Sequence, residues 1–201
     1  MKVAIVGGTG DFGLALALRL VDAGDEVVLG SRDAARAQEK ADEVGAASGT
    51  TNDEAVANVE LVVLATNASA ALETAVALAD AIGTTPVLSV ASDLRSTEAL
   101  SLAERTQELL AGPVVAGLQS LAAAKLAAGR PDEDAFVCGD DADAKALALE
   151  LAGKAVAGRA LDAGPLSRAR VLEGLTGLIV SLNKRYKGHA GIRVTGLPED
   201  P

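Results

Sequence analysis

A glycine-rich loop near the start of the chain separates an apolar run from an amphipathic one. Residues 4–20 read AIVGGTGDFGLALALRL. The pattern G-x-G-x-x-G is formed by Gly8, Thr9, Gly10, Asp11, Phe12 and Gly13. The pattern alone is weak, because 21 glycines in 201 residues produce chance matches. Its place after a first strand and before a first helix is typical of a dinucleotide-binding βαβ unit, which constrains the fold more than any other feature.

Each glycine of the pattern has its own expected role. Gly8 permits a tight turn, Gly10 lets the backbone approach a pyrophosphate, and Gly13 lets the helix pack on the strand. Free amides and a partial positive charge at the start of that helix favour phosphate groups. We therefore predict a dinucleotide site, against the alternative of a plain turn between strand and helix.

Short apolar segments rich in Val and Leu alternate with helical patterns, as a parallel sheet covered on both faces requires. The predicted strands lie at residues 2–6, 26–29, 61–65, 86–90, 114–118, 135–138 and 159–161. The predicted helices lie at 12–23, 34–44, 53–57, 69–82, 97–110, 141–154 and 168–184, and 190–198 is either a last strand or an extended arm. This order predicts an α/β fold, a Rossmann-type doubly wound parallel sheet with a smaller C-terminal α/β domain.

A short polar stretch, AAGRPDEDA at residues 127–135, marks the expected domain boundary. We place an NADP-binding Rossmann domain at 1–130 and a smaller domain that closes the cofactor cleft at 131–201.

The composition argues against several classes of function. A net charge of −10 and only three Phe and Tyr residues argue against a nucleic-acid partner. One cysteine, Cys138, and one histidine, His189, leave no internal disulfide and no usual metal-ligand set. No apolar run is long enough to cross a membrane and no signal peptide precedes the first strand, so we expect a cytoplasmic protein.

The residues after the second predicted strand discriminate between the two nicotinamide cofactors. An NAD site usually carries an acid there, which binds the ribose 2′-hydroxyl. Here Ser31 and Arg32 stand at the strand end, and Arg36 follows one helical turn later. A hydroxyl and two guanidinium groups suit a 2′-phosphate, and Asp33 would turn its carboxylate toward its own helix as an N-cap. We predict NADP(H) rather than NAD(H).

Polar residues also follow the later predicted strands, whose carboxyl ends should line the cofactor cleft. We expect Thr66 and Asn67 to face the nicotinamide half or its ribose. Ser89 and Ala91 at the next strand end, and Gln119 and Ser120 at the following one, should surround the ring. The alternative for each of them is simple loop polarity.

Nearly the whole chain resembles the NADPH-dependent F420 reductases. The stretches that carry the resemblance are MKVAIVGGTGDFGLALALRL…EVVLGSR, FVCGDDADAK and RALDAGPLSRARVLEGLTGLIVSLN, of which the C-terminal ones are more discriminating. It implies that Thr9, Ser31, Arg32 and Arg36 bind NADPH, which exchanges a hydride with the deazaflavin coenzyme F420 in the cleft between the domains. It also implies a homodimer, with the apolar helix around residues 172–182 as a candidate interface unless that helix is buried within one subunit.

Two segments depart from the family pattern. A Thr-hydrophobic-Pro segment reads Thr66-Asn67-Ala68 here, and a His-Thr/Asn-hydrophobic-Pro segment beside the deazaflavin reads Gln119-Ser120-Leu121-Ala122. Glutamine can hydrogen-bond a ring carbonyl but cannot carry a proton. A reductase of the same fold acting on a flavin, imine or ketone, or a non-catalytic NADP-binding regulatory protein, therefore stays open.

Direct hydride transfer needs aligned reactants and exclusion of water, and it needs no nucleophile or metal. We accordingly assign no acid, base or nucleophile. Gln119 and Ser120 are candidates for positioning the ring and polarising it as negative charge develops there.

Overall fold

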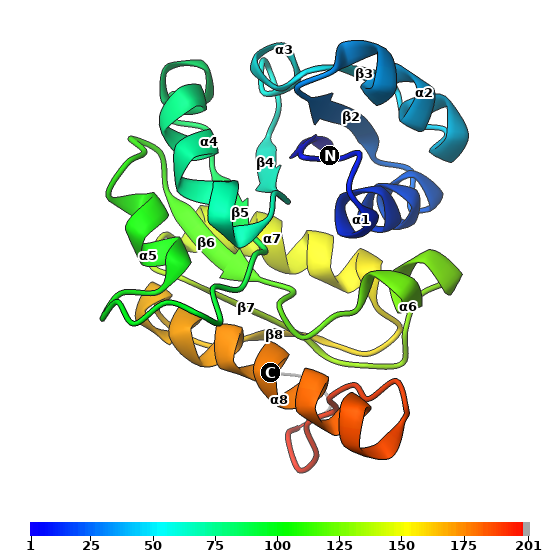
Figure 1. Ribbon diagram of the computed structural model, residues 1–201, viewed down its shortest axis with the longest axis vertical. Helices are drawn as coiled ribbons and strands as arrows, with labels where there is room; N and C mark the ends of the chain where they lie inside the picture. The colour runs from blue at the N-terminus through cyan, green and yellow to red at the C-terminus, as the bar shows by residue number, and fades with distance from the viewer. Residues whose placement is uncertain (199–201) are drawn as a thin grey trace.

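The computed structural model describes residues 1–198, which form one sheet flanked by helices (Figure 1). The strands are β1 Lys2–Val6, β2 Glu26–Ser31, β3 Ser48–Thr51, β4 Leu61–Leu64, β5 Val87–Ser89, β6 Val114–Gly117, β7 Ala135–Gly139 and β8 Ala160–Asp162. The helices are α1 Asp11–Asp22, α2 Ala34–Val44, α3 Asn52–Ala55, α4 Ala68–Ile82, α5 Leu102–Gln107, α6 Ala123–Ala128, α7 Ala142–Ala155 and α8 Ala169–Tyr186, with a 3-10 turn η1 at Leu166–Arg168.

The sheet confirms the predicted doubly wound fold. Its strand order is β3-β2-β1-β4-β5-β6-β7-β8, and the first six strands in the chain are parallel. The chain winds outward from β1 to β3 and then returns to β4 on the other side of β1, which leaves a crevice at the carboxyl ends of these strands. β7 runs antiparallel to β6, and β8 is parallel to β7. The beginnings of β7 and β8 therefore lie at the same edge as the carboxyl ends of the other strands.

Alternate residues of the central strands enter two separate cores. Val3 and Ile5 pack with residues of α1, α6 and α7 on one face of the sheet. Ala4 and Val6 pack with residues of α4, α5 and α8 on the other. This alternation follows from the two-residue period of a strand, and it explains why consecutive residues of these strands, such as Val3–Val6 of β1, are apolar.

α7 ties the C-terminal part of the chain to its beginning. Ala148 and Leu151 of this helix are buried in the same core as Ile5. At its end, the Lys154 Nζ lies 2.7 Å from the Asp25 Oδ1, which precedes β2. Desolvation of Lys154 is outweighed by hydrogen bonds and charge from Asp25 and Glu150, which raise the pKa of its amine.

The structure contains two short elements that were not predicted and one helix that is shorter than predicted. β3 was not predicted, because the half-buried sequence SGTT contains no apolar run. α6 was also missed. The helix predicted over 97–110 is shorter, because Ser101 and Glu104 form a capping box that starts α5 at Leu102.

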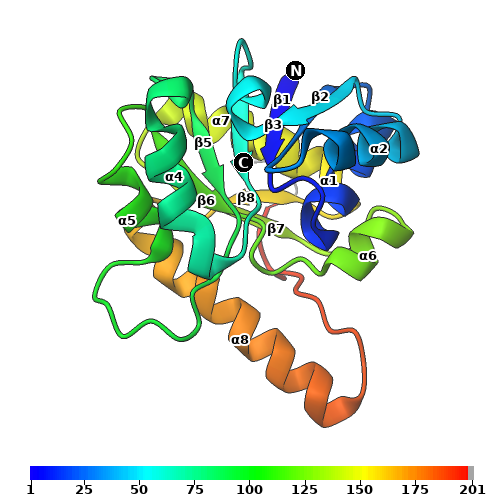
Figure 2. The same cartoon turned by 45° about the horizontal axis from the view of Figure 1, so that its top comes forward.

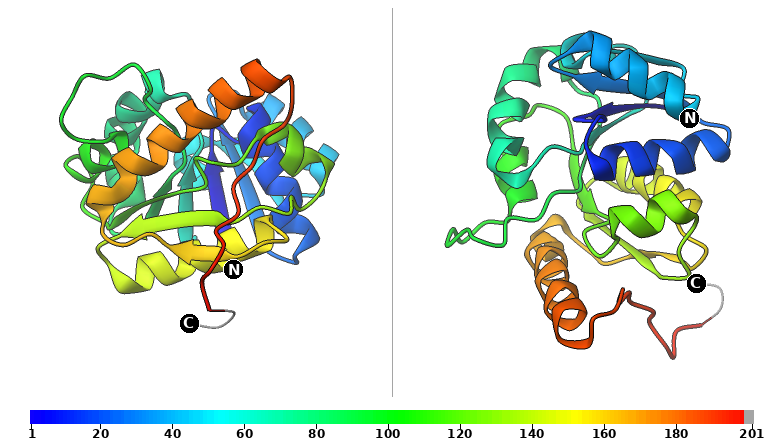
Figure 3. Two further views of the ribbon diagram at one scale, coloured as in Figure 1. Left: turned by 90° about the horizontal axis from the view of Figure 1, so that it is seen from below. Right: turned by 45° about the vertical axis from the view of Figure 1, so that its right-hand side comes forward.

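The region around the expected domain boundary contains no break in the sheet, since β7 pairs directly with β6. The division at residue 130 stays a prediction, and residues 199–201 of the second unit lie outside the described part. Residues 187–198 form neither helix nor strand and return along the start of β7 (Figure 3). There the Asp134 backbone N–H donates to the Ile192 carbonyl at 2.8 Å, and the Val194 N–H donates to the Asp134 carboxylate at 2.8 Å.

No helix within residues 1–198 is both long enough and apolar enough to cross a membrane.

Candidate cofactor-binding cleft

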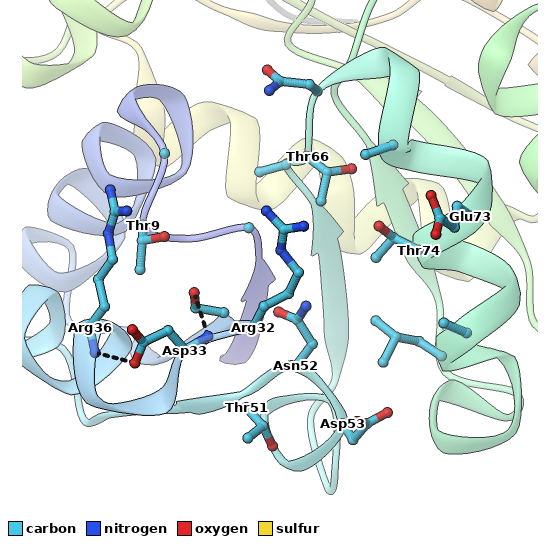
Figure 4. Close-up of a pocket in the computed structure, with 18 residues that line it drawn as sticks. Thr9, Arg32, Asp33, Arg36, Thr51, Asn52, Asp53, Thr66, Glu73 and Thr74 are labelled. Carbon is cyan, nitrogen blue, oxygen red and sulfur yellow. Dashed lines mark hydrogen bonds between the residues drawn. The ribbon is translucent and has the colours of Figure 1, made fainter.

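A cleft of about 850 Å³ opens at the carboxyl ends of β1 to β4 (Figure 4). Its walls are the glycine loop, the turns after β2, β3 and β4, and one side of α4. It brings together seven predicted cofactor residues, which are Thr9, Gly10, Ser31, Arg32, Arg36, Thr66 and Asn67. Its volume is within the usual range for small-molecule and cofactor sites.

The turn between β1 and α1 depends on glycine at two consecutive positions. Gly7 adopts a φ of 76°, a left-handed conformation that residues with a Cβ rarely adopt. The positive φ thus falls one residue before the expected turn residue Gly8. A Cβ on Gly8 would come within 2.8 Å of the Ile5 carbonyl oxygen, so this position is restricted by close packing. Both amides donate to the Gly30 carbonyl at 3.1 Å, which fixes the loop against β2.

The remaining two glycines of the pattern differ in what surrounds them. A Cβ on Gly13 would lie 2.9 Å from the Gly8 Cα, as expected where a helix packs closely on the loop. A Cβ on Gly10 would meet only the Gly7 carbonyl oxygen, at an ordinary contact distance of 3.4 Å. Gly10 lines the cleft, so a larger side chain there would take up cleft space without clashing with the chain.

The start of α2 places two arginines at the cleft. The Asp33 Oδ1 accepts from the Arg36 backbone N–H at 3.1 Å, which confirms the predicted N-cap. The Ser31 Oγ accepts from the Asp33 N–H at 3.3 Å. The exposed side chains of Arg32 and Arg36 extend in the same direction, with Thr9 drawn between them (Figure 4). Two guanidinium groups and a hydroxyl therefore line one end of the cleft.

The turn after β3 contributes residues that sequence reasoning missed. Thr51, Asn52 and Asp53 line the cleft opposite Glu73 and Thr74 of α4. An available signal was the spacing of Thr51 and Glu54, which is typical of a helix start; the Thr51 Oγ1 accepts from the Glu54 N–H at 3.4 Å.

Two buried oxygens of the cleft residues have no hydrogen-bond partner in residues 1–198. They are the Asn52 Oδ1 and the Thr66 Oγ1. A buried polar group without a hydrogen-bond partner lowers the stability of the protein. A polar ligand that bonds to these two oxygens would remove that penalty, so both are candidates for ligand contacts.

Ser89, Gln119 and Ser120 lie outside the lining of this cleft, at the ends of β5 and β6. All three are buried, and the Gln119 Nε2 donates to the Ser89 carbonyl at 3.1 Å. Within the described residues, the Gln119 Oε1 and the Ser120 Oγ have no partner. Ala91, half-buried on the same side, does not line the cleft either.

α8 closes over this second group of residues. The Thr176 Oγ1 donates to the Gln119 carbonyl at 2.7 Å and shares a hydrogen bond of 2.7 Å with the Ser92 Oγ. The sequence offered no local signal for this contact, because Thr176 lies 57 positions from Gln119 and 84 from Ser92.

Four residues of the glycine pattern also fall outside the cleft lining. Gly8 and Gly13 lie behind it, in the contacts described above. Asp11 begins α1 and lines a separate, mainly apolar groove of about 380 Å³ between α1 and α6. Phe12 packs at the border of the core beneath α1.

Acid–base and metal chemistry have few candidates here. Burial raises the pKa of the Cys138 thiol to about 12, so this thiol is not a nucleophile at neutral pH. Within residues 1–198, no three His, Cys, Asp or Glu side chains are grouped as a metal site would require.

A family model described as NADP oxidoreductase, coenzyme F420-dependent, matches residues 2–93. The F420-dependent NADP reductase of Methanothermobacter marburgensis is 38% identical over 224 residues, covering 99% of this chain and all of that protein. The one from Methanocaldococcus jannaschii is 34% identical, covering 98% of this chain and 99% of that protein.

Solved structures of two proteins share the fold of this chain. The crystal structure of a protein from Arthrobacter sp. FB24, proposed to be an F420-dependent NADP reductase, has a TM-score of 0.85 and 25% identity, covering 98% of this chain and all of that one. An imine reductase of Streptomyces aurantiacus shares the fold at a TM-score of 0.68 and 23% identity, covering 90% of this chain and 61% of that one. On the full-length likeness to its curated relatives, the chain belongs to the family of F420-dependent NADP reductases.

Proposed function

We propose that this protein transfers a hydride between NADPH and the deazaflavin coenzyme F420. The observation that carries the proposal is the likeness to F420-dependent NADP reductases over 99% of the chain. The cleft geometry supports it, because the glycine loop and the two arginines lie where a Rossmann fold binds a dinucleotide.

The cleft residues fit NADPH in charge and shape. The open space before Gly10 suits a pyrophosphate, next to the free amides at the start of α1. Arg32 and Arg36 suit a 2′-phosphate, and the Asp33 carboxylate, which would repel that phosphate, is occupied in capping α2. Thr66 and Asn67 stand at the end of β4, toward the ribose and nicotinamide.

Bound NADPH and F420 supply the redox chemistry themselves, as donor and acceptor of a hydride. The work of the chain is to hold both ligands and to exclude water from the space between them. This division explains why no nucleophile, metal or charged acid–base pair is needed in the cleft.

We place the deazaflavin beside the ends of β5 and β6. Buried atoms without partners support this placement, since the Gln119 Oε1 and the Ser120 Oγ can each bond a polar ring atom. The Thr176 hydroxyl holds the Gln119 backbone in place. Gln119 and Ser120 would thereby position the ring and stabilise charge that develops on it.

We further propose a cytoplasmic homodimer. α8 supports the dimer, because Val171, Leu178 and Val180 expose more than half of their surface along one helix. An acidic chain with a single buried cysteine fits a reducing compartment.

The test of the function mixes the protein with NADPH and oxidised F420 and follows the loss of the visible deazaflavin absorbance. We expect turnover with NADPH and little with NADH. Tight NADPH binding without reduction of F420 would contradict the proposal.

A second candidate is an NADP-dependent reductase with another acceptor, such as a flavin, imine or ketone. The observation that favours it is Gln119, which stands where the resemblance implies a histidine and which, unlike histidine, cannot carry a proton. Turnover of such an acceptor by a protein inactive with F420 would support it. Activity with F420 that greatly exceeds activity with any of the three would exclude it as the main function.

A further inference from the structure

The last turns of α8 stand beyond the sheet, at the edge where the strands end. Thr176 contacts Gln119 at the end of β6, and the helix continues to Tyr186. Ten further residues at a rise of about 1.5 Å each carry it roughly 15 Å past that contact. Figure 2 shows this end of α8 projecting from the body, with the following residues returning to β7.

This projecting end differs in charge from the rest of the molecule. The chain carries a net charge of −10, yet residues 174–198 contain four Lys or Arg and no Asp or Glu. Arg193 is paired with Asp132 at 2.6 Å. The other three are Lys184, Arg185 and Lys187, here called the basic helix end, and all three are exposed. No carboxylate of residues 1–198 forms an ion pair with them.

Favourable interaction with the helix dipole explains cations in the last turn of a helix, at Lys184 and Arg185. The dipole also favours a cation at Lys187, the C-cap residue of α8, but it does not explain the absence of Asp and Glu from residues 174–198. Hydrogen bonds also hold the end of α8 and the residues that follow it in place. The Asn183 Oδ1 accepts from the Ala190 N–H at 2.5 Å, and the buried Asp134 carboxylate binds both the Arg159 guanidinium and the Val194 N–H. The basic helix end is thus held at the edge where we place the deazaflavin.

We propose that the basic helix end binds the anionic side chain of F420, which carries a phosphodiester and glutamyl carboxylates. The inference rests on the proposed function. With the ring at Gln119, the side chain must leave the buried strand ends toward solvent, and the basic helix end lies on that side. An acidic protein repels a polyanionic ligand elsewhere on its surface, so a local group of cations both attracts and orients it.

The test compares F420 with the deazaflavin riboside that lacks phosphate and glutamate. The variant is Lys184→Gln/Lys187→Gln, and the matched control is Lys2→Gln/Lys40→Gln, which removes the same charge at a distance. Binding is measured by quenching of deazaflavin fluorescence without NADPH. We expect the Kd for F420 to rise about three- to tenfold in the variant only. The Kd for the riboside and for NADPH should not change, and added salt should weaken F420 binding to wild type more than to the variant.

Each other outcome has a defined meaning. If the variant loses affinity equally for F420 and the riboside, or for neither, the inference is wrong. The proposed function still stands in that case as long as the protein turns over the riboside. A wild-type protein that binds and reduces neither deazaflavin overturns both. A variant that binds F420 normally but no longer sediments with phosphatidylglycerol vesicles assigns the basic helix end to a membrane surface instead. Thermal melts of the variant and the control establish that both are folded.

Discussion

The nucleotide side and the ring side of the site are built in different ways. On the nucleotide side, functional groups belong to short continuous stretches, the glycine loop and residues 31–36, and they line an open cleft. On the ring side, Ser89, Gln119 and Thr176 come from three distant parts of the chain and are joined by one buried and one partly buried hydrogen bond. The first side presents groups that are ready for a ligand, whereas the second presents a packed surface with a few unpaired atoms.

Substitutions on the two sides of the site should therefore have different effects. Changes at Gly10, Arg32 and Arg36, which line the cleft on the nucleotide side, should alter affinity without altering the fold, because a Cβ at Gly10 and the two exposed arginine side chains contact little else. Changes on the ring side should alter activity and stability together, because the Gln119 backbone that carries the ring-facing side chain also binds Thr176 of α8.

The largest expected effect is at Gly10. Gly10→Val should reduce NADPH affinity by more than about a hundredfold, because the side chain takes the space of the pyrophosphate. The protein should stay folded, since a Cβ at this position meets nothing closer than 3.4 Å. Calorimetry measures the NADPH affinity, and circular dichroism checks that the protein is folded.

Gly13→Val is the matching comparison, because a Cβ there would lie 2.9 Å from the Gly8 Cα. It should lower the melting temperature strongly. Normal NADPH affinity in a folded Gly10→Val protein would rule out the assignment of the loop.

Removal of both cleft arginines should have the next largest effect. Each guanidinium–phosphate contact is charge-assisted, and because both side chains are exposed we take about 1.5 kcal/mol for each, the lower end of the usual range. Arg32→Ala/Arg36→Ala should therefore weaken NADPH binding by roughly two orders of magnitude and leave NADH binding nearly unchanged. Titrations with the two cofactors measure this ratio, and an equal loss for both would show that the arginines have a structural role.

A smaller effect is expected at Gln119 on the ring side. Gln119→Ala should cost about 1–2 kcal/mol of transition-state stabilisation, seen in kcat/KM for F420. Gln119→His should keep activity within about tenfold, if hydrogen bonding and shape are what the position supplies. Loss of NADPH affinity in Gln119→Ala would mean that the two sides of the site are not separate.

The smallest effect concerns Glu173, whose buried carboxylate fixes α8 to the start of α5. Its Oε1 accepts from the Leu102 N–H at 2.7 Å. Burial is the main cause that raises its pKa above the ordinary 4.5. The contribution of Glu173 to the free energy of unfolding is therefore fully present below about pH 4.5. It is lost as the pH rises through the higher pKa of the folded state.

Glu173→Gln keeps the acceptor oxygen and removes the charge. We expect its melting temperature, relative to wild type, to increase between pH 4.5 and pH 8. Melts at a series of pH values measure this change, and parallel curves for the two proteins would count against it.

The same contrast explains what sequence reasoning could predict. The N-cap at Asp33 depends on neighbouring residues, and this prediction was confirmed. Gly13 was predicted to let the helix pack on the strand, whereas a Cβ there would meet Gly7 and Gly8 of the loop that follows β1. Asn52 was missed because its strand, β3, is polar and short. The contact between Thr176 and Gln119 exists only once α8 is packed, so no local pattern encodes it.

The burial of α7 residues beside the first strand also affects how the chain is made. Ile5 and Leu16 share a core with Leu151, which is synthesised much later. At about 5–20 residues per second, the roughly 40 residues from the end of β6 to the end of α7 take about 2–8 s. Through that interval this face of the sheet is covered by α1 but lacks α7, so the nascent protein exposes apolar surface until its seventh helix leaves the ribosome.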